Sequence, residues 1–251
     1  MQNPISVQEV TKIYGSGATA FRALDAVDLE VECGEVMLLM GPSGSGKTTL
    51  ISILGCILRP TSGSVKILGE EVTRLNEKQL PRVRLENIGF IFQGFNLFPT
   101  LTAGENVELA LDLKKQRGSV AQQRARGLLE QVGLGAKYDS FPADLSGGEK
   151  QRVAIARAVA TDPHVLLADE PTAALDSHSG RIVMEMLREL AHRHGRAVVV
   201  VTHDNRVLEF SDRVVRIEDG RINRSSVISS QSSVTETWPA WGLVTDNGCN
   251  L

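Results

Sequence analysis

The spacing of apolar and polar residues changes several times along the chain. Residues 5–10 and 24–31 alternate between apolar and polar positions, a period of two that is typical of half-buried antiparallel strands. Residues 36–40 are apolar at every position, which is the pattern of a parallel strand buried on both faces. The chain is therefore expected to begin with an antiparallel region and to continue into a parallel sheet.

Strand-like and helix-like segments follow one another through the remainder of the chain. Further strands are expected at residues 63–68, 88–93, 165–168, 197–201 and 214–217. Helices are expected at residues 48–58, 105–115, 120–132, 149–160 and 179–194. Strands that alternate with helices indicate an α/β fold with a parallel sheet. The antiparallel strands are expected to form an antiparallel β subdomain, and the helical stretch at about 97–160 an inserted α-helical subdomain.

The composition shifts after about residue 223. Serine dominates residues 225–233, and both tryptophans, Trp238 and Trp241, lie in the last stretch. We expect residues 1–223 to form one domain and residues 224–251 to form a flexible Ser-rich tail. The alternative is a docking peptide, because tryptophan is costly to leave in water and is enriched at binding hot spots.

Length and charge narrow the class of protein. The chain has 251 residues, which fits one large α/β domain or one domain with an inserted lobe, and its formal net charge of -3 gives no footprint for nucleic acid. A membrane-spanning helix needs about 20 apolar residues, and no run here is that long. The N-terminus lacks a signal-peptide pattern, so a cytoplasmic location is expected. Cys33, Cys56 and Cys249 are far apart and odd in number, which indicates reduced thiols and no disulfide or metal framework.

A glycine-rich loop carries the first candidate chemistry. Residues 41–48 read Gly-Pro-Ser-Gly-Ser-Gly-Lys-Thr and match G-x-x-x-x-G-K-[ST] between a strand and a helix. Glycines let the backbone wrap closely, so that amide N–H groups and the helix N-terminus face a phosphate. Lys47 is expected to reach the β- and γ-phosphates, and the Thr48 hydroxyl to ligate Mg²⁺. The candidate nucleotide-binding residues of this segment are Gly41, Pro42, Ser43, Gly44, Ser45, Gly46, Lys47, Thr48 and Thr49.

Two acidic residues end a later strand. Asp169 and Glu170 directly follow the apolar residues 165–168. Carboxylates at the carboxyl edge of a parallel sheet face the ligand crevice. Asp169 is expected to hold Mg²⁺ through water, and Glu170 to act as general base on the attacking water. An ordinary strand followed by a polar turn is the alternative, and the phosphate loop favours the functional interpretation.

These two motifs belong to a series in fixed order. The series comprises residues 41–48, Gln93 after a strand, Leu-Ser-Gly-Gly-Glu at 145–149 before a helix, Asp-Glu-Pro-Thr-Ala-Ala-Leu-Asp at 169–176, and Thr-His-Asp at 202–204. With these motifs the chain resembles the nucleotide-binding subunit of ATP-binding cassette (ABC) transporters over about residues 5–222. The resemblance implies a P-loop NTPase core, ATP and Mg²⁺ as ligands, and an ABC nucleotide-binding domain at 1–223.

The resemblance also implies that two chains share each ATP. Ser146, Gly147 and Gly148 would bind the γ-phosphate of an ATP held by a second nucleotide-binding subunit, so that a head-to-tail dimer, expected to be a homodimer, encloses two ATP molecules. These residues open a helix, where amide groups favour a phosphate. Asp176 would lie across the dimer interface. Glu149 stands where the family often has glutamine.

Three further residues receive roles from the resemblance. Gln93 would sense Mg²⁺ and the water and link the site to a membrane partner. His203 would contact the γ-phosphate and orient the water. Tyr14 would stack on adenine, and an ordinary surface tyrosine is the alternative. The remaining histidines are expected at the surface: His164, His178, His192 and His194.

Residues 89–107 resemble the branch of macrolide exporters, lipoprotein-releasing ATPases and cyanobacterial heterocyst-glycolipid exporters. Residues 202–213 resemble the heterocyst-glycolipid exporters more than the other two groups. An apolar cluster lies just after Gln93 and comprises Phe95, Leu97, Phe98 and Leu101. Two interpretations stay open for this cluster: core packing of the helical lobe, or a groove that receives a short helix of the permease.

The expected function is hydrolysis of MgATP for a bacterial exporter of a lipid, glycolipid, lipoprotein or drug-like substrate. An integral membrane permease would be the partner, with a possible periplasmic adaptor reached through it. The chain would then lie in the cytoplasm, on the inner face of the cell membrane. An importer subunit and a soluble ABC protein outside transport are the alternatives, and the partner distinguishes them.

Overall fold

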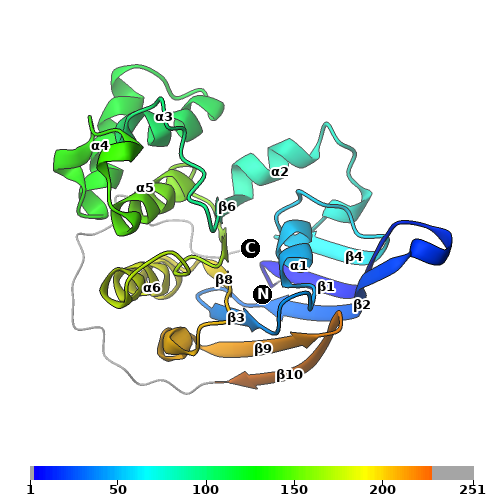
Figure 1. Ribbon diagram of the computed structural model, residues 1–251. Helices are drawn as coiled ribbons and strands as arrows, with labels where there is room; N and C mark the ends of the chain where they lie inside the picture. Colours follow the sequence, from blue (N-terminus) through cyan, green and yellow to red (C-terminus); the bar gives the residue numbers. More distant parts are fainter. Residues whose placement is uncertain (1–2, 228–251) are drawn as a thin grey trace.

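Two β-sheets and a helical lobe make up the protein, which is described here from a computed structural model over residues 3–227 (Figure 1). The four-stranded antiparallel sheet has the order β2-β1-β4-β5. Its strands are β1 (Ile5–Tyr14), β2 (Phe21–Val31), β4 (Ser62–Ile67) and β5 (Glu70–Glu71). The predicted antiparallel β subdomain is therefore confirmed.

The six-stranded sheet has the order β10-β9-β3-β8-β7-β6. Its strands are β3 (Val36–Met40), β6 (Ile88–Ile91), β7 (Val165–Asp169), β8 (Ala197–Val201), β9 (Arg213–Glu218) and β10 (Arg221–Val227). All neighbours in this sheet run parallel except β9 and β10. The carboxyl ends of β3, β7 and β8 consequently meet at one edge, which is where a ligand crevice forms in such sheets.

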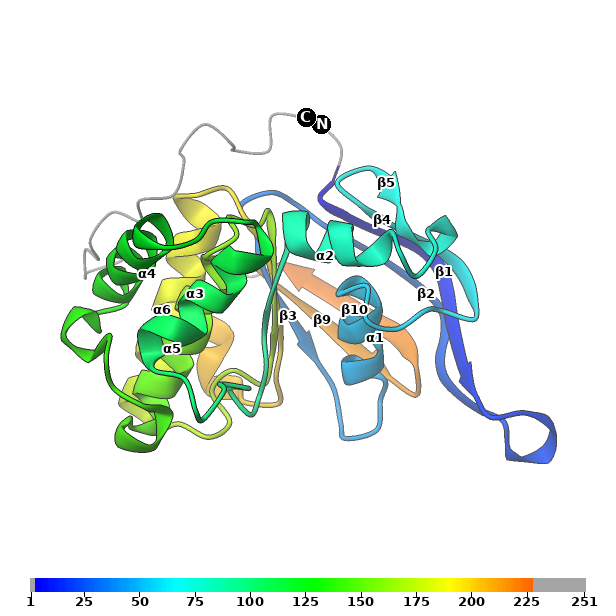
Figure 2. The same cartoon turned by 90° about the horizontal axis from the view of Figure 1, so that it is seen from above.

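Alternate residues of the central strands serve two hydrophobic cores. In β3, Val36 and Leu38 belong to the core shared with the helical lobe, whereas Met37 and Leu39 belong to the core shared with the antiparallel sheet. Figure 2 shows the six-stranded sheet lying between these two layers. Burial on both faces explains why β3 is apolar at every position.

Helices cover both faces of the parallel sheet. They are α1 (Lys47–Leu54), α2 (Leu80–Asn87), α3 (Ala103–Leu113), α4 (Ser119–Gln131), α5 (Gly147–Val159) and α6 (Ser177–His192). Short 3-10 helices lie at Gly17–Thr19, Val72–Arg74, Gly135–Lys137, Pro142–Asp144 and Asn205–Phe210. The helices α3, α4 and α5 gather into one lobe, as predicted from the helical stretch at 97–160 (Figure 1).

Among the helices and strands, α2, β5 and β10 are absent from the sequence prediction. Helix α2 begins with Leu-Pro-Arg and has only two buried residues, Leu80 and Val83, so its periodicity is weak. Strand β10 is polar and pairs only with β9, at the edge of the sheet, and it continues past the expected boundary at residue 223 to Val227. The Ser-rich tail with Trp238 and Trp241 lies outside the described residues, and its role stays a prediction.

Other sequence expectations meet mixed outcomes. Within residues 3–227 no helix is long and apolar enough to cross a membrane. Cys56 is a buried free thiol, but Cys33 is disulfide-bonded, so the expectation of reduced thiols is wrong there. Spacing along the chain does not reveal which distant residues meet in space. Cys249 lies outside the described residues.

Candidate functional site

A cleft of about 570 Å³ opens at the carboxyl edge of the parallel sheet. Residues from β1, β2, the loop between β3 and α1, and the ends of β6, β7 and β8 line it. These residues are Tyr14, Phe21, Ala23, Gly41, Pro42, Ser43, Gly44, Gly46, Lys47, Thr48, Thr49, Gln93, Asp169, Glu170, Val201 and His203. The structure thus brings four of the five motifs to one place, although residues 1–60 and 160–205 are far apart in sequence.

The loop between β3 and α1 has a path that glycine alone allows. A Cβ atom on Gly41 would lie 2.0 Å from the carbonyl oxygen of Ile217, and one on Gly46 would lie 2.5 Å from that of Ala23. Gly46 also has a φ of +104° where it begins α1, and Gly44 has a φ of +78°. The backbone therefore forms a close cradle at a helix N-terminus, the arrangement that binds phosphate.

Lys47 folds back over this cradle. Its Nζ donates hydrogen bonds to the carbonyl oxygens of Gly41 at 2.8 Å and Pro42 at 2.7 Å. Ser45 is buried, and its Oγ has no hydrogen-bond partner among the described residues. The loop consequently holds one ammonium group and one unsatisfied hydroxyl beside the space that a phosphate would occupy.

Asp169 ends β7 at the floor of the cleft. Burial raises the pKa of its carboxyl group, the negative charge of Glu170 raises it further, and the positive charge of Lys47 opposes both. A cation beside Asp169 would offset the cost of this buried charge. Among residues 3–227, no three His, Cys, Asp or Glu side chains gather to hold a metal. The site suits Mg²⁺, which needs only one or two carboxylates beside substrate phosphates.

Glu170, which follows Asp169 in the chain, contacts His203. Glu170 Oε1 lies 2.7 Å from His203 Nδ1, and the Glu170 amide donates to the Val201 carbonyl at 2.9 Å. The neighbouring strands β7 and β8 therefore bring the acid and the histidine together. Glu170 has a φ of +48°, a left-handed conformation that is uncommon for this residue type and that concentrates at functional sites. A carboxylate that orients an imidazole in this way can support proton transfer from water.

Two aromatic rings flank the outer part of the cleft. Tyr14 and Phe21 are register partners in the β1–β2 hairpin, and they are 42% and 59% exposed. Lys12 Nζ lies 5.2 Å from the centroid of the Tyr14 ring. The sequence motifs did not point to Phe21. The signal that could have revealed it is an aromatic residue at the start of the strand that pairs with the Tyr14 strand.

Ser146, Gly147, Gly148 and Asp176 do not line this cleft. Ser146 caps α5: its Oγ accepts from the Glu149 amide at 3.3 Å, and Glu149 Oε2 accepts from the Ser146 amide at 2.8 Å. Asp176 caps α6 in the same manner by accepting from backbone amides of the first turn. These residues form a second patch, because they surround the start of α6 rather than the phosphate loop.

Contacts between glycines and α6 define the second patch. A Cβ atom on Gly148 would lie 2.6 Å from Ser179 Oγ, and one on Gly147 would lie 3.3 Å from the Ala174 carbonyl. Each chain therefore carries a phosphate cleft and, separately, a helix N-terminus without a phosphate loop opposite it.

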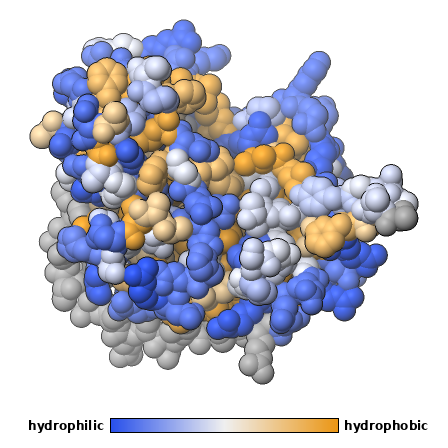
Figure 3. Space-filling view, in the orientation of Figure 1, coloured by the Kyte–Doolittle hydropathy of each residue, from blue (hydrophilic) through white to orange (hydrophobic). Residues whose placement is uncertain are grey.

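The apolar cluster after Gln93 divides between the two interpretations. Leu97 packs against the core of the helical lobe. Phe98 is 50% exposed and lines an apolar groove of about 530 Å³ between α2 and the lobe. Figure 3 shows apolar side chains on this face of the molecule. Phe95 and Leu101 do not line the groove, but the Phe95 carbonyl accepts from Arg157 of α5 at 2.9 Å.

The other histidines are only partly at the surface. His178 and His192 are exposed as expected. His164 and His194 are half-buried, and burial is the main reason why the pKa of each is lowered. Neither lines the cleft.

Known proteins are similar to this chain over most of its length. The family model described as ABC transporter matches residues 24–173. An uncharacterized ABC transporter ATP-binding protein of Thermotoga maritima is 48% identical over 222 residues, which cover 88% of this chain and 94% of the relative. The macrolide export ATP-binding/permease protein MacB of Hyphomonas neptunium is 46% identical over 218 residues, 87% of this chain but 34% of that longer protein.

A solved structure has the same fold. It is the dimeric structure of a post-hydrolysis state of the ATP-binding cassette MJ0796 bound to ADP and Pi, with a TM-score of 0.82 and 43% sequence identity. The match covers 89% of this chain and 98% of that one. The likeness confirms the predicted fold class, a P-loop NTPase core with a parallel sheet, an antiparallel β subdomain and an α-helical subdomain.

Proposed function

Since the chain belongs to the ABC transporter family, we propose that this ABC ATPase subunit powers export through a separate membrane permease. The substrate class would be a lipid, glycolipid, lipoprotein or drug-like molecule. The similarity to a macrolide export protein supports export. The observation that carries the ATPase role is the convergence of Lys47, Asp169, Glu170 and His203 in one cleft.

Each of these side chains has a separate part in the proposed hydrolysis. The backbone of the glycine loop would hold the β- and γ-phosphates, and Lys47 would exchange its two carbonyl partners for phosphate oxygens. Glu170 would accept a proton from the attacking water, while His203, oriented through Nδ1, would face the γ-phosphate. Thr48, Gln93 and Asp169 would hold Mg²⁺, which neutralises charge on the phosphates when bound.

Two chains would complete each site. The patch of Ser146, Gly147 and Gly148 would supply its amides to the γ-phosphate held by the other chain, and Asp176 would lie across the interface. The dimeric state of the solved relative supports this arrangement. We propose that the pair is a homodimer and that the apolar groove beside Phe98 receives the permease on the inner face of the membrane. A periplasmic adaptor would be reached through the permease.

The general base is tested with Glu170→Gln. The glutamine side chain has the shape of the glutamate it replaces but cannot take a proton, so turnover should fall at least about 100-fold. ATP binding should stay within about twofold of wild type, since the phosphate contacts are intact. A long-lived dimer on ATP is expected by gel filtration. Glu130→Gln, on the exposed face of α4, is the matched control and should hydrolyse ATP normally. Normal turnover in Glu170→Gln would remove Glu170 from this role.

Identification of the partner protein tests the proposal that the chain serves export. Affinity purification of the tagged chain from native membranes, with identification of what co-purifies, should yield a permease without a solute-binding protein. A solute-binding protein that is needed for activity would indicate an importer, and recovery of the chain with no membrane protein would indicate a role outside transport.

A further inference from the structure

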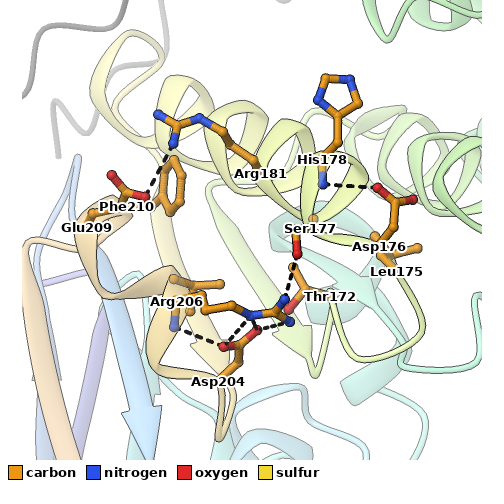
Figure 4. A pocket seen from close by; sticks show the side chains of 12 residues that line it. Thr172, Leu175, Asp176, Ser177, His178, Arg181, Asp204, Arg206, Glu209 and Phe210 are labelled. Carbon is orange, nitrogen blue, oxygen red and sulfur yellow. Dashed lines mark hydrogen bonds and ion pairs between the residues drawn. The ribbon is translucent and has the colours of Figure 1, made fainter.

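A second cavity, of about 340 Å³, lies between the start of α6 and the 3-10 helix Asn205–Phe210 (Figure 4). The 3-10 helix starts two residues after His203, and α6 starts one residue after Asp176. The cavity therefore separates the segment that carries the histidine of the phosphate cleft from the segment that belongs to the second patch. Two arginines cross this gap, Arg206 from the 3-10 helix and Arg181 from α6.

Arg206 holds the segment around His203. Its Nε lies 3.0 Å from both carboxylate oxygens of Asp204, and its Nη2 lies 2.8 Å from one of them. Asp204 in turn donates its backbone N–H to Thr202 Oγ1 at 3.0 Å, and Thr202 is fully buried. The backbone on both sides of His203 is thereby tied to one guanidinium group and to the core.

The remaining nitrogen of Arg206 reaches the other side. Nη1 donates to Ser177 Oγ at 2.8 Å, and Figure 4 shows this contact crossing to the first residue of α6. Ser177 follows Asp176, whose carboxylate accepts from Ser179, and Ser179 packs against Gly148. One continuous chain of contacts therefore runs from the His203 segment to the glycines of the second patch.

We propose that Arg206 is a positioning residue that couples the two half-sites of the chain: through Ser177 it fixes the His203 segment against the start of α6. This inference rests on the proposed ATPase function. When a partner chain engages the second patch, α6 and the His203 segment would move as one unit, so that the histidine is aligned only in the complete dimer. The rigid fork of arginine suits this task, because it binds a carboxylate with one edge and keeps a donor for the serine.

Because Arg206 is exposed, an effect of its replacement on activity can be distinguished from an effect on folding. Its side chain is 64% exposed, and exposed ion pairs contribute little to stability. Arg181 offers a matched control, because it crosses between the same two elements. Its Nη1 lies 3.4 Å from Glu209 Oε1, six residues after His203, and its guanidinium lies 5.4 Å from the Phe210 ring.

The test is a double-mutant cycle on the full chain, with ATPase kinetics at saturating MgATP. Arg206→Ala and Ser177→Ala should each lower kcat by about 3- to 10-fold, the order expected for one lost hydrogen bond at an exposed site. The double variant should be no slower than Arg206→Ala, because both changes remove the same contact. The KM for ATP should stay within about twofold and the melting temperature within about 2 °C of wild type. Arg181→Ala should keep the wild-type kcat.

Several results would overturn the inference. A wild-type kcat in Ser177→Ala, effects that multiply in the double variant, or an equal loss in Arg181→Ala would each exclude the Arg206–Ser177 contact as the link. If the wild-type chain hydrolyses ATP and Glu170→Gln does not, such a result leaves the proposed function intact. An inactive wild-type chain would overturn both.

Discussion

Tyr14 and Phe21 line the same cleft as the glycine loop, and we expect them to extend the ATP site beyond the phosphates. They face each other across the hairpin of β1 and β2 at the outer part of the cleft. Both rings are partly exposed, and an exposed aromatic ring contributes little to a hydrophobic core. A purine base offers each ring a flat apolar partner, so the pair is suited to hold the adenine end of ATP.

Replacement of Phe21 by alanine should therefore weaken ATP binding. Stacking of a base on an aromatic ring contributes about 1–3 kcal/mol, so the Kd for ATP should rise at least about fivefold. The chemistry lies elsewhere in the cleft, and kcat at saturating ATP should not change. Equilibrium binding of ATP to the purified chain measures the effect, with Val120→Ala, an exposed residue of α4, as the control. An unchanged Kd would place the base away from Phe21.

Elements owe their ends to a few polar side chains, and α5 is the clearest case. Ser146 and Glu149 exchange hydrogen bonds in a capping box, which positions the glycines of the second patch. The hydrogen bond from the Ser146 amide is the main reason why the pKa of Glu149 is lowered. A lowered pKa in the folded state means that the stabilisation is complete above the ordinary pKa of about 4.3 and is lost as the pH falls through the folded-state value.

Glu149→Gln should remove this pH dependence. A glutamine also accepts the amide hydrogen bond but does not titrate, so the variant should melt within about 2 °C of wild type at pH 7. As the pH falls below about 4, the wild type should lose more stability than the variant. Glu149→Ala should cost about 1 kcal/mol at pH 7, because the Ser146 amide loses its acceptor. Thermal melts at several pH values measure all three, and parallel pH curves for wild type and Glu149→Gln would contradict the assignment.

The loop before α3 depends on one buried amide. Asn106 is fully buried; its Oδ1 accepts from the Phe98 N–H at 2.8 Å, and its Nδ2 donates to the carbonyls of Phe98, Leu101 and Thr102. Asn106→Leu keeps the branching and the number of side-chain heavy atoms but leaves these groups unpaired, which should cost about 2–3 kcal/mol. For a chain of this size the melting temperature should fall by about 4–12 °C. Gln122→Leu, on the exposed face of α4, should change it little.

Local pattern accounts for much of the fold at this scale, and its failures have physical causes. The central strands were predictable because burial on both faces makes β3 and β8 apolar throughout and β7 apolar up to Asp169 at its end. Strand β10 was not, because an edge strand is defined by pairing with β9 rather than by its own residues. The motifs pointed to the residues of the cleft, but the contact of Arg206 with Ser177 joins residues 29 apart and has no local signal.

At the scale of the whole molecule, the residues proposed to bind ATP lie in two separate regions of the chain. The phosphate cleft holds the acids and His203, whereas Ser146, Gly147 and Gly148 lie around the start of α6. A twofold axis that places the patch of one chain over the cleft of the other would complete both sites at once, as isologous dimers do. This arrangement predicts the ATPase activity of mixtures of two defective variants.

Lys47→Ala disables the cleft, and Ser146→Arg disables the patch; each variant alone should have almost no ATPase activity. In a mixed dimer, the intact cleft of the Ser146→Arg chain faces the intact patch of the Lys47→Ala chain, so one site of two is whole. Random pairing of equal amounts gives half mixed dimers, and if the sites act independently the mixture should recover about a quarter of wild-type activity. The measurement is the ATPase rate after the two purified variants are mixed and allowed to exchange.

A mixture of two different cleft variants, Lys47→Ala and Glu170→Gln, is the control. It should recover no activity, because every site then contains a defective cleft. If the first mixture stayed inactive while gel filtration showed mixed dimers, the patch and the cleft would have to act within one chain, and the head-to-tail arrangement would be wrong.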